Sequence, residues 1–424
     1  MLIIPFLTGK SKPFFRSFKK SIVKTAKKRN GRRRERRVKI LHTSDWHVGK
    51  RLMGRERLEE QAEVLDEIVS VCESERIELV LLAGDVFDTY TPGAEAEELF
   101  FSKIKRVAGD DRAVLIISGN HDDGVRLSAV SPFSEEQGVY IVGNARNPVS
   151  VKATARKTKP IRSGKGYVVF ENERGEKAFI STLPYPNEAR FKEEKSDLPY
   201  VERMKKWIDE GESGNVEKLP SVFLAHIFVA GGKVSDSERE IDLGGARAIP
   251  VEALPKSDYI ALGHLHKKQH MGGGHCYYSG SPLQYSFDET ADKGVKVFDL
   301  TPEGVQNLKD VPLTKGKKLL RLEADSVETA ETLLKTYPQN HVGMKLILSA
   351  PLTSLDAAKL SENENLVSLV TEIRAENELQ FQSRKGLSDE ALFNAFYQNT
   401  YNAEPKAELK TLFLQTLNEL EENQ

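Results

Sequence analysis

The feature that most constrains the fold of this chain is a series of short apolar runs, each followed directly by a polar motif. In residues 38–145, three apolar runs are strand-like, and two segments between them carry apolar residues at helical spacing. The strands are expected at 38–42, 77–83 and 113–118, and the helices at 56–75 and 94–107. Strands joined through helices run parallel, and ligands gather beyond their carboxyl ends. The motifs DWH, GDVFD and GNHD are therefore expected on one edge of a sheet.

The pattern changes after residue 145 and then returns. Residues 146–184 hold short alternating runs broken by Gly, Pro and Lys, which predict antiparallel hairpins. Strand-like runs resume at Ser221, and two of them carry polar motifs: VFLAHI contains His226, and DYIALG leads into GHLH at 263–266. The sequence therefore predicts an α/β domain over residues 38–290, to which five motifs from distant segments contribute.

Together these five motifs supply the ligands of a two-metal site. Two adjacent divalent cations need imidazole nitrogens and carboxylate or amide oxygens, with one carboxylate able to bridge. Each motif alone is weak evidence, because a lone histidine on an apolar strand, such as His226, is more often a satisfied core residue than a ligand. Their order and spacing in one chain favour the metal site. Gly84, Gly119 and Gly263 each precede a ligand, where a tight turn or close approach to the metals would exclude a side chain.

Charge is unevenly distributed along the chain. The net charge is −1, but residues 1–37 contain 14 Lys or Arg and a single acid, Glu35, so the remainder is acidic. The segment 1–37 is interpreted as a phosphate-binding arm, a transit-like peptide, or a translated leader ahead of a true start at Val38, and it is assigned no fold. Its apolar residues 1–7 are too short to cross a bilayer. Two distant cysteines, Cys72 and Cys276, fit a reducing, cytoplasmic location without disulfides.

Beyond Leu300 the composition turns polar, and two further parts are predicted. Residues 318–322, 327–337 and 344–348 have a strand-helix-strand pattern within a small α+β cap domain at 291–350. Residues 351–424 are expected to be helical and to bind a partner through two apolar stripes joined by the turn NAEP. The stripes consist of Leu392, Phe393, Phe396 and Tyr397, and of Leu409, Leu412, Phe413, Leu417 and Leu420.

These motifs resemble those of the calcineurin-like metallophosphoesterases and, within that superfamily, of the SbcD exonuclease subunits. The likeness rests on KILHTSDWHVGKRL, GRERLEEQ, LLAGDVFDTYTP, SGNHDDGVRLS, and GHLH followed by YYSGSPLQYSFDE. It is close over residues 38–290 and looser beyond. The resemblance implies a four-layer αββα sandwich with a small cap and a helical tail, two divalent ions, Mn²⁺ first and Mg²⁺ as the alternative, and 3′ to 5′ cleavage of DNA.

The resemblance also implies a role for each motif residue. Asp45, His47 and His266 would hold the first metal, Asp85 would bridge, and Asn120, His226 and His264 would hold the second. His121 would be a catalytic histidine that contacts the phosphate and no metal, with Asp88 and Asp122 orienting the ligands.

Other polar residues near the motifs are interpreted separately. Candidate contacts to DNA phosphates are Lys50, Arg51, Arg55 and Arg57, for which a solvated loop is an equal alternative. His42 lies inside the first strand and is interpreted as structural. His270, His275 and Cys276 make a poor zinc site, because one sulfur and two loop histidines do not complete it.

From this resemblance we expect the nuclease subunit of an SbcCD-type complex, acting as a double-strand exonuclease and a single-strand or hairpin endonuclease in DNA repair, recombination and replication. Its expected partners are DNA and an SbcC-like coiled-coil ATPase, in a heterotetramer that contains a homodimer of this subunit. The alternative is an enzyme acting on small phosphodiesters or phosphomonoesters, because the metal site is common to the superfamily. The third interpretation, a non-catalytic scaffold, is disfavoured by the complete ligand set.

Overall fold

The computed structural model describes residues 36–144, 146–186, 198–238, 247–374, 388–401 and 403–422. The chain divides into two compact units. The first extends to Arg321 and also includes Tyr337–Gly343 and Asn365–Ser368, and the second contains the other C-terminal residues. Of the basic segment 1–37, only Arg36 and Arg37 fall within the described residues. Arg37 forms an ion pair with Asp299 at 2.8 Å, so the folded part of the first unit includes it.

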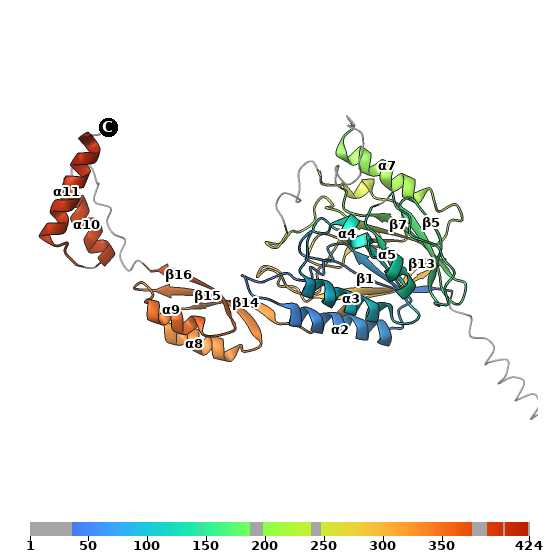
Figure 1. The fold of residues 1–424 in the computed structure, drawn as a ribbon, viewed down its shortest axis with the longest axis horizontal. Helices are drawn as coiled ribbons and strands as arrows, with labels where there is room; N and C mark the ends of the chain where they lie inside the picture. The colour runs from blue at the N-terminus through green and yellow to red at the C-terminus, as the bar shows by residue number, and fades with distance from the viewer. Residues whose placement is uncertain are drawn as a thin grey trace, which may run out of the picture. The chain divides into compact units, whose positions relative to one another are not determined.

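Two β-sheets form the centre of the first unit (Figure 1). The first sheet has the order β13-β12-β1-β2-β3-β4, in which β1 to β4 run parallel and β12 and β13 are antiparallel. Its strands are β1 (Val38–Thr43), β2 (Leu79–Ala83), β3 (Ala113–Ile117), β4 (Val139–Val142), β12 (Gly294–Thr301) and β13 (Gly304–Pro312). The strands predicted near 38–42, 77–83 and 113–118 are confirmed. The sheet continues past residue 290, where the domain boundary was predicted.

The second sheet has the order β10-β11-β9-β8-β7-β6-β5. β7, β8, β9 and β11 run parallel, whereas β5 and β6 are antiparallel hairpin strands, as the alternating pattern of 146–184 predicts. The strands are β5 (Lys159–Gly164), β6 (Tyr167–Glu171), β7 (Lys177–Leu183), β8 (Ser221–His226), β9 (Tyr259–Gly263), β10 (Gln269–His270) and β11 (Cys276–Tyr278).

Helices cover the outer face of each sheet. α2 (Leu58–Ser74) and α3 (Ala94–Ala108) pack on the first sheet against alternate strand residues such as Leu82. The side chain of Leu81 points the opposite way, because strand side chains alternate, and it packs in the core between the two sheets. α7 (Tyr200–Glu212) covers the far face of the second sheet. This is the predicted αββα sandwich. The short helices are α4 (Gly124–Ser128), α5 (Ser131–Ser134), η1 (Glu135–Gln137) and η4 (Val251–Ala253).

A three-stranded sheet of order β14-β15-β16 follows the sandwich in the chain. β14 (Lys318–Ala324), α8 (Val327–Thr336) and β15 (Asn340–Leu348) confirm the predicted strand-helix-strand pattern. α9 (Ser354–Ser361) and β16 (Leu366–Ile373) lie beyond residue 351, where only helices were predicted. The prediction missed β16 because its apolar residues are interrupted by Ser, Thr and Glu, and this pattern is weak against charged flanks.

The last described residues form two helices, α10 (Asp389–Tyr401) and α11 (Ala407–Glu422). The ring of Phe393 stacks on that of Phe413 with centroids 4.1 Å apart, so the two predicted stripes contact each other. Phe396 and Leu412 remain 62% and 59% exposed. Among the described residues, no helix combines the length and apolarity that crossing a membrane requires.

Candidate metal centre

All the proposed metal ligands lie at the carboxyl ends of strands. Asp45 and His47 follow β1, Asp85 follows β2, Asn120 follows β3, His226 ends β8, and His264 and His266 follow β9. Backbone hydrogen bonds fix these loops to one another: Asp45 N–H donates to Gly84 O at 3.1 Å, and His47 N–H donates to Asp85 O at 3.0 Å. The His264 N–H donates to Asp45 Oδ1 at 2.9 Å and so joins the loops of the two sheets. The predicted convergence of the motifs is confirmed.

Several of these residues have a backbone conformation that side chains rarely adopt. The φ angle is +54° at Asp45, +43° at His47, +49° at Asp85 and +111° at His264. Such conformations persist where the surrounding structure enforces them, and they cluster at functional sites. The glycines beside the ligands lie too close to neighbouring residues to carry a side chain. A Cβ on Gly84 would lie 2.3 Å from His226 Nδ1, and one on Gly263 would lie 1.8 Å from Ala83 O. These positions exclude a side chain, as the sequence predicts.

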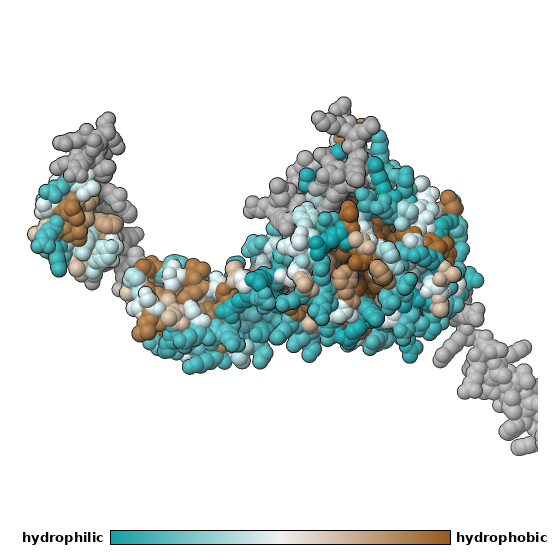
Figure 2. Space-filling model, viewed as in Figure 1, coloured by the Kyte–Doolittle hydropathy of each residue, from teal (hydrophilic) through white to brown (hydrophobic). Residues whose placement is uncertain are grey.

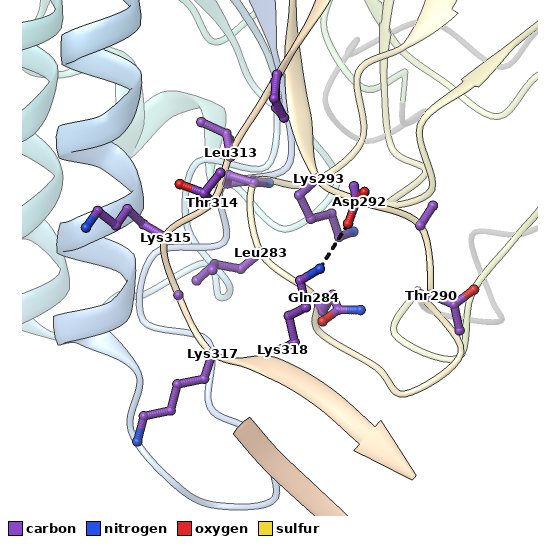
Figure 3. Close-up of a pocket in the computed structure, with 14 residues that line it drawn as sticks. Leu283, Gln284, Thr290, Asp292, Lys293, Leu313, Thr314, Lys315, Lys317 and Lys318 are labelled. Atoms are coloured by element: carbon purple, nitrogen blue, oxygen red, sulfur yellow. Dashed lines mark hydrogen bonds and ion pairs between the residues drawn. The ribbon is translucent and has the colours of Figure 1, made fainter. Parts of the chain in front are cut away.

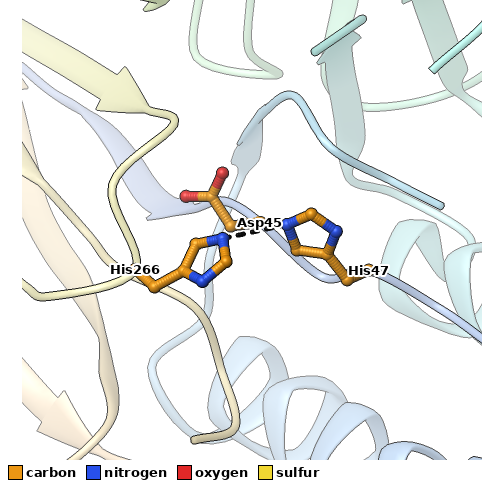
Figure 4. A group of neighbouring side chains, drawn as sticks. All are labelled: Asp45, His47 and His266. Carbon is orange, nitrogen blue, oxygen red and sulfur yellow. Dashed lines mark hydrogen bonds between the residues drawn. The ribbon is translucent and has the colours of Figure 1, made fainter. Parts of the chain in front are cut away.

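Asp45, His47 and His266 form the first group of candidate ligands (Figure 4). One ligand atom from each lies within 4.8 Å of the others, and all three side chains are buried. His47 Nε2 and His266 Nε2 face each other at 3.0 Å. Asp45 Oδ2 accepts a hydrogen bond from Ser44 Oγ at 2.6 Å, which fixes the carboxylate. The group matches the three residues predicted for one metal.

Asp85 lies between the first group and the remaining candidate ligands. Its Oδ2 is 3.4 Å from His47 Nε2 and 3.5 Å from His226 Nε2. Its Oδ1 accepts a hydrogen bond from the His121 N–H at 2.8 Å. Asp45, Asp85 and His226 also form a group with ligand atoms within 4.8 Å. This central position is the one that a bridging carboxylate requires.

Three electron-pair donors converge on the other side of Asp85. Asn120 Oδ1 lies 2.8 Å from His226 Nε2 and 3.0 Å from His264 Nδ1. His226 Nδ1 is 2.8 Å from the carbonyl oxygen of Ala83, to which it can only donate, so Nε2 is the ring nitrogen left to offer a lone pair to a cation. An amide oxygen and imidazole nitrogens with facing lone pairs fit a cation between them. With two carboxylates alongside, the donor chemistry fits a pair of divalent cations.

The buried carboxylates of the site favour the binding of cations. Burial lowers the pKa of His47 to about 3, so this imidazole is neutral and able to bind a metal. Burial raises the pKa of Asp45 to about 6. Burial would also raise the pKa of Asp85, but the surrounding histidines, His226 first, hold it well below its usual value. In turn, although burial opposes it, the Asp85 carboxylate raises the pKa of His226 to about 9. These buried carboxylates therefore demand cationic partners.

His121 and the two other motif carboxylates surround the candidate ligands. His121 Nδ1 is 2.7 Å from Asp88 O and can only donate to it, which fixes the ring. Asp88 Oδ1 is 3.3 Å from His47 Nδ1 and 2.8 Å from Lys50 Nζ. Asp122 accepts the backbone N–H groups of Gly119, Val86 and Phe87 at 2.8, 3.2 and 3.0 Å. It thereby ties the GNHD loop to the GDVFD loop. His47, Asp88 and His121 also lie within 4.8 Å as a group of potential ligands.

The four candidate DNA contacts near the first motif are mostly engaged elsewhere. Arg57 is 2% exposed, donates to Gln284 O at 2.6 Å and forms an ion pair with Glu60 at 2.9 Å. It cannot reach a phosphate, so the prediction for Arg57 was wrong: its position before an amphipathic helix does not reveal that its side chain is buried. Lys50 is paired with Asp88, and Arg55 donates to Leu366 O. Arg51 is exposed and forms an ion pair with Glu56.

Two aromatic residues and a set of polar residues near the site were missed by motif reasoning. The Tyr285 ring packs edge-on against His47 and His266, with centroids 5.5 and 5.6 Å apart, and Tyr185 stacks on His264 at 6.1 Å. Ser237, Glu238, Glu289 and Lys293 surround His266. The string YSFDE contains Tyr285 and Glu289, so the sequence could have marked these two residues as candidates. Their positions beside His47 and His266 follow only from contacts between segments that are distant in the sequence.

The remaining histidines and cysteines lie apart from this site. His42 is fully buried between the sheets, with Nδ1 3.1 Å from Tyr259 Oη and Nε2 3.2 Å from Leu262 O, as a structural residue would be. The groups of potential metal ligands found among the described residues include none of His270, His275 and Cys276.

This fold and this site define the class of the protein. The sequence model of the calcineurin-like phosphoesterase family matches residues 38–268, and the chain belongs to that family. The SbcD chain of the nuclease SbcCD from Bacillus subtilis is 34% identical over 91% of this chain and 99% of its own length. The corresponding chain of Staphylococcus epidermidis is 28% identical over 85% of this chain and 93% of its own. Within the calcineurin-like phosphoesterases, the chain is a member of the SbcD family of nuclease subunits.

Proposed function

We propose that this protein is the nuclease subunit of an SbcCD-type complex and hydrolyses DNA phosphodiester bonds with two divalent metal ions. The observation that carries this proposal is the convergence of Asp45, Asp85, Asn120 and four histidines on one buried site at the edge of both sheets. The extent of the likeness to the SbcD chains, through cap and tail, favours DNA over a small phosphoester. We infer Mn²⁺ as the metal, because imidazole mixed with carboxylate and amide oxygens suits it better than Mg²⁺.

Each residue then has a defined task. Two bound cations would supply activated water and neutralise charge on the phosphoryl oxygens. Asp45, His47 and His266 would hold one ion, and Asn120, His226 and His264 the other, with Asp85 between them. His121 would act directly on the substrate. Because its Nδ1 is held by Asp88 O, we assign its Nε2 to the scissile phosphate and to proton transfer to the leaving 3′ oxygen.

Contacts to the DNA backbone are better supplied by a second basic region, formed by Lys233 and by the two lysines that follow His266 in the chain. Lys233, Lys267 and Lys268 line a cavity of about 630 Å³ together with His270 and Asp288. Lys267 is neutralised by Asp288 at 2.8 Å. We infer that Lys233 and Lys268 bind DNA phosphates. Lys268→Ala should weaken DNA binding and lower the slope of log affinity against log salt by about one, with no change in hydrolysis of a small phosphodiester.

We also propose a homodimer formed through the first unit. Phe101, Ile104, Val130, Phe133 and Val139 line an apolar groove of about 290 Å³ on α3, α5 and β4. Phe133 is 78% exposed, and Figure 2 shows apolar side chains gathered at the surface over this region. A second copy of this chain is the occupant we favour, because an exposed apolar patch marks an association surface. Sedimentation of the full chain tests it, and a monomer at micromolar concentration would exclude it.

The substrate is tested by comparing three compounds on the purified full chain with added Mn²⁺. We expect rapid degradation of linear duplex DNA from its ends, cleavage of single-stranded DNA, and slow hydrolysis of a chromogenic phosphodiester such as bis(p-nitrophenyl) phosphate. The reverse order, with the small phosphodiester preferred by orders of magnitude in kcat/KM, would establish the alternative function. Chelation of the metal should abolish all three activities.

A further inference from the structure

His266 is held by the surrounding protein at its backbone and its side chain. Its N–H donates to Glu238 Oε1 at 2.7 Å. Its carbonyl oxygen accepts from Lys293 Nζ at 2.9 Å. Its Nδ1 is hydrogen bonded to Ser237 Oγ. The opposite ring nitrogen, Nε2, is the atom that faces His47 in the candidate metal centre. Of these contacts, the one at Nδ1 decides which electron pair the ring offers.

The direction of this hydrogen bond follows from the next residue. Ser237 Oγ lies 2.6 Å from Glu289 Oε1, and a carboxylate can only accept, so the single hydroxyl proton of Ser237 points to Glu289. Ser237 Oγ must then accept from His266. The proton of the His266 ring is therefore on Nδ1, and the lone pair is on Nε2, toward the metal centre. Ser237 and Glu289 thus select the tautomer that can bind a metal.

Lys293 pairs with the carboxylate of Glu289 that faces the Ser237 hydroxyl group. The Glu289 side chain is 1% exposed and forms an ion pair with Lys293 Nζ at 2.5 Å. Lys293 also donates to Ser281 Oγ at 2.8 Å, so its ammonium group is fully occupied. A buried ion pair with this hydrogen bonding is stable, whereas either charge alone would not be.

The other side of Lys293 faces a cavity, which offers a matched control. The cavity is about 300 Å³ and lies among residues 282–284, 290–293 and 312–318 (Figure 3). Lys318 points into it and forms an ion pair with Asp292 at 3.1 Å, and both of these side chains are about 70% exposed. Lys318 therefore shares the cavity of Lys293 without a described contact to His266.

We propose that Ser237, Glu289 and Lys293 form a positioning relay that fixes the Nδ1–H tautomer of His266 and so sets the affinity of the metal site formed with Asp45 and His47. The proposal rests on the metal assignment in the proposed function and goes beyond it, because it concerns residues that bind no metal. Removal of a group that orients a metal-bound histidine typically weakens metal affinity by about 10- to 100-fold.

The first test is an equilibrium titration of the metal-free full chain with Mn²⁺, followed by calorimetry. We expect Ser237→Ala to bind one of two ions about 10-fold more weakly, and Ser237→Thr, which keeps the hydroxyl group, to restore the affinity. Lys318→Met should leave both affinities unchanged. If the parent protein bound no pair of ions, the proposed function itself would fail. If it bound two, and Ser237→Ala bound both as tightly, the relay would be excluded.

The second test separates the relay from simple charge balance. Glu289→Gln leaves Lys293 buried without a partner, so this variant is expected to unfold at a lower temperature in chelator. The double variant Glu289→Gln/Lys293→Met removes both charges and should melt closer to the parent than Glu289→Gln does. We expect it still to bind one ion about 10- to 100-fold more weakly. A double variant that regained the affinity of the parent would show that the two residues only neutralise each other.

Discussion

Asp85 is the single residue on which both proposed metal ions depend. Its carboxylate lies between His47 and His226, 3.4 and 3.5 Å from their Nε2 atoms. We expect Asp85→Ala to lower kcat/KM for DNA by several orders of magnitude and to reduce the bound metal below two ions per chain, since both sites lose the same ligand. Metal analysis of the dialysed variant, together with its rate, is the measurement. Near-normal turnover with two ions bound would disprove the bridging role.

His121 is expected to behave differently, because we assign it to the substrate and to no metal. His121→Asn should lower turnover by about 10² to 10⁴, the usual worth of a positioned general acid or base, while metal content and DNA affinity stay close to those of the parent. Its ring also lies within 4.8 Å of potential ligand atoms of His47 and Asp88, so the assignment is open to test. Loss of an ion from this variant would place His121 among the ligands.

The candidate ligands, and Asp88 and Asp122 as residues proposed to orient them, could be named from sequence motifs, whereas the residues around His266 could not. The motifs indicate metal binding by their residue types and spacing, and they contain Asp45, Asp85, Asn120 and the two GHLH histidines. Glu289 stands in the string YSFDE, but neither Glu289 nor Lys293 has a spacing that points to His266. Their relation to His266 exists only once β9 and the segment after β11 lie side by side. Arg57 illustrates the opposite failure, since a basic residue beside a metal motif suggests a phosphate contact until its burial is known.

At the scale of elements, α2 is fixed to the start of β15 by one carboxylate. Glu60 accepts from Arg57 and from Lys317 N–H at 2.9 and 3.0 Å, and its Oε1 lies 2.6 Å from His341 Nε2 of β15. Burial would raise the pKa of Glu60, but hydrogen bonds from His341 and Arg57 lower it to about 2. Ionised Glu60 therefore stabilises the folded protein above the pKa it has when unfolded, and this contribution is lost as the pH falls toward about 2.

We expect Glu60→Gln to lower the free energy of unfolding by roughly 1–3 kcal/mol near pH 7, with the difference from the parent shrinking progressively below pH ~4.5. Urea unfolding of both proteins between pH 3 and 7 measures this. Glu63→Gln, an exposed change on the same helix, is the control and should have no effect. If the free energy of unfolding of Glu60→Gln were lower than that of the parent by the same amount at every pH, the carboxylate would act by packing and not by charge.

The elements that sequence predicts well are those with a strong periodic pattern. β1, β2, β3 and α2 have nearly continuous or strictly periodic apolar residues because both faces of the strands and one face of the helix are buried. β16 is half exposed, with the burial of a sheet edge, and its pattern is correspondingly weak. The extent to which an element is buried, more than its position in the chain, therefore decides whether its apolar pattern can be recognised in the sequence.

For the molecule as a whole, the helix pair α10–α11 is the part we assign to the ATPase partner. The two helices bury Phe393 against Phe413 but leave Phe396, Tyr401 and Leu412 about 60% exposed, more apolar surface than an unpartnered helix pair keeps. Such a surface can bind the apolar face of a coiled coil. Because β16 ends at Ile373, a truncation that removes 375–424 leaves all three strands of the sheet β14-β15-β16 in the chain.

We expect this truncated protein to retain Mn²⁺-dependent cleavage of linear DNA and to lose co-purification with the coiled-coil ATPase, together with any stimulation by ATP. A milder pair of variants, Phe396→Ser and Leu412→Ser, should weaken the same interaction without removing the helices. Thr400→Ala, on the same helix, is the matched control. Undiminished capture of the ATPase by the truncated chain would assign the helix pair a purely structural role.

The left-handed backbone at Asp45, His47, Asp85 and His264 has a consequence for anyone who tries to engineer this protein. Each conformation is less favourable than an ordinary one by on the order of 1–3 kcal/mol, and glycine would relieve it. A directed-evolution screen that selects for heat resistance alone would therefore favour glycine at these four positions, and so would remove side chains that we assign to the metal ions. Libraries built on this scaffold should exclude these four positions, or couple every round of heating to a nuclease assay.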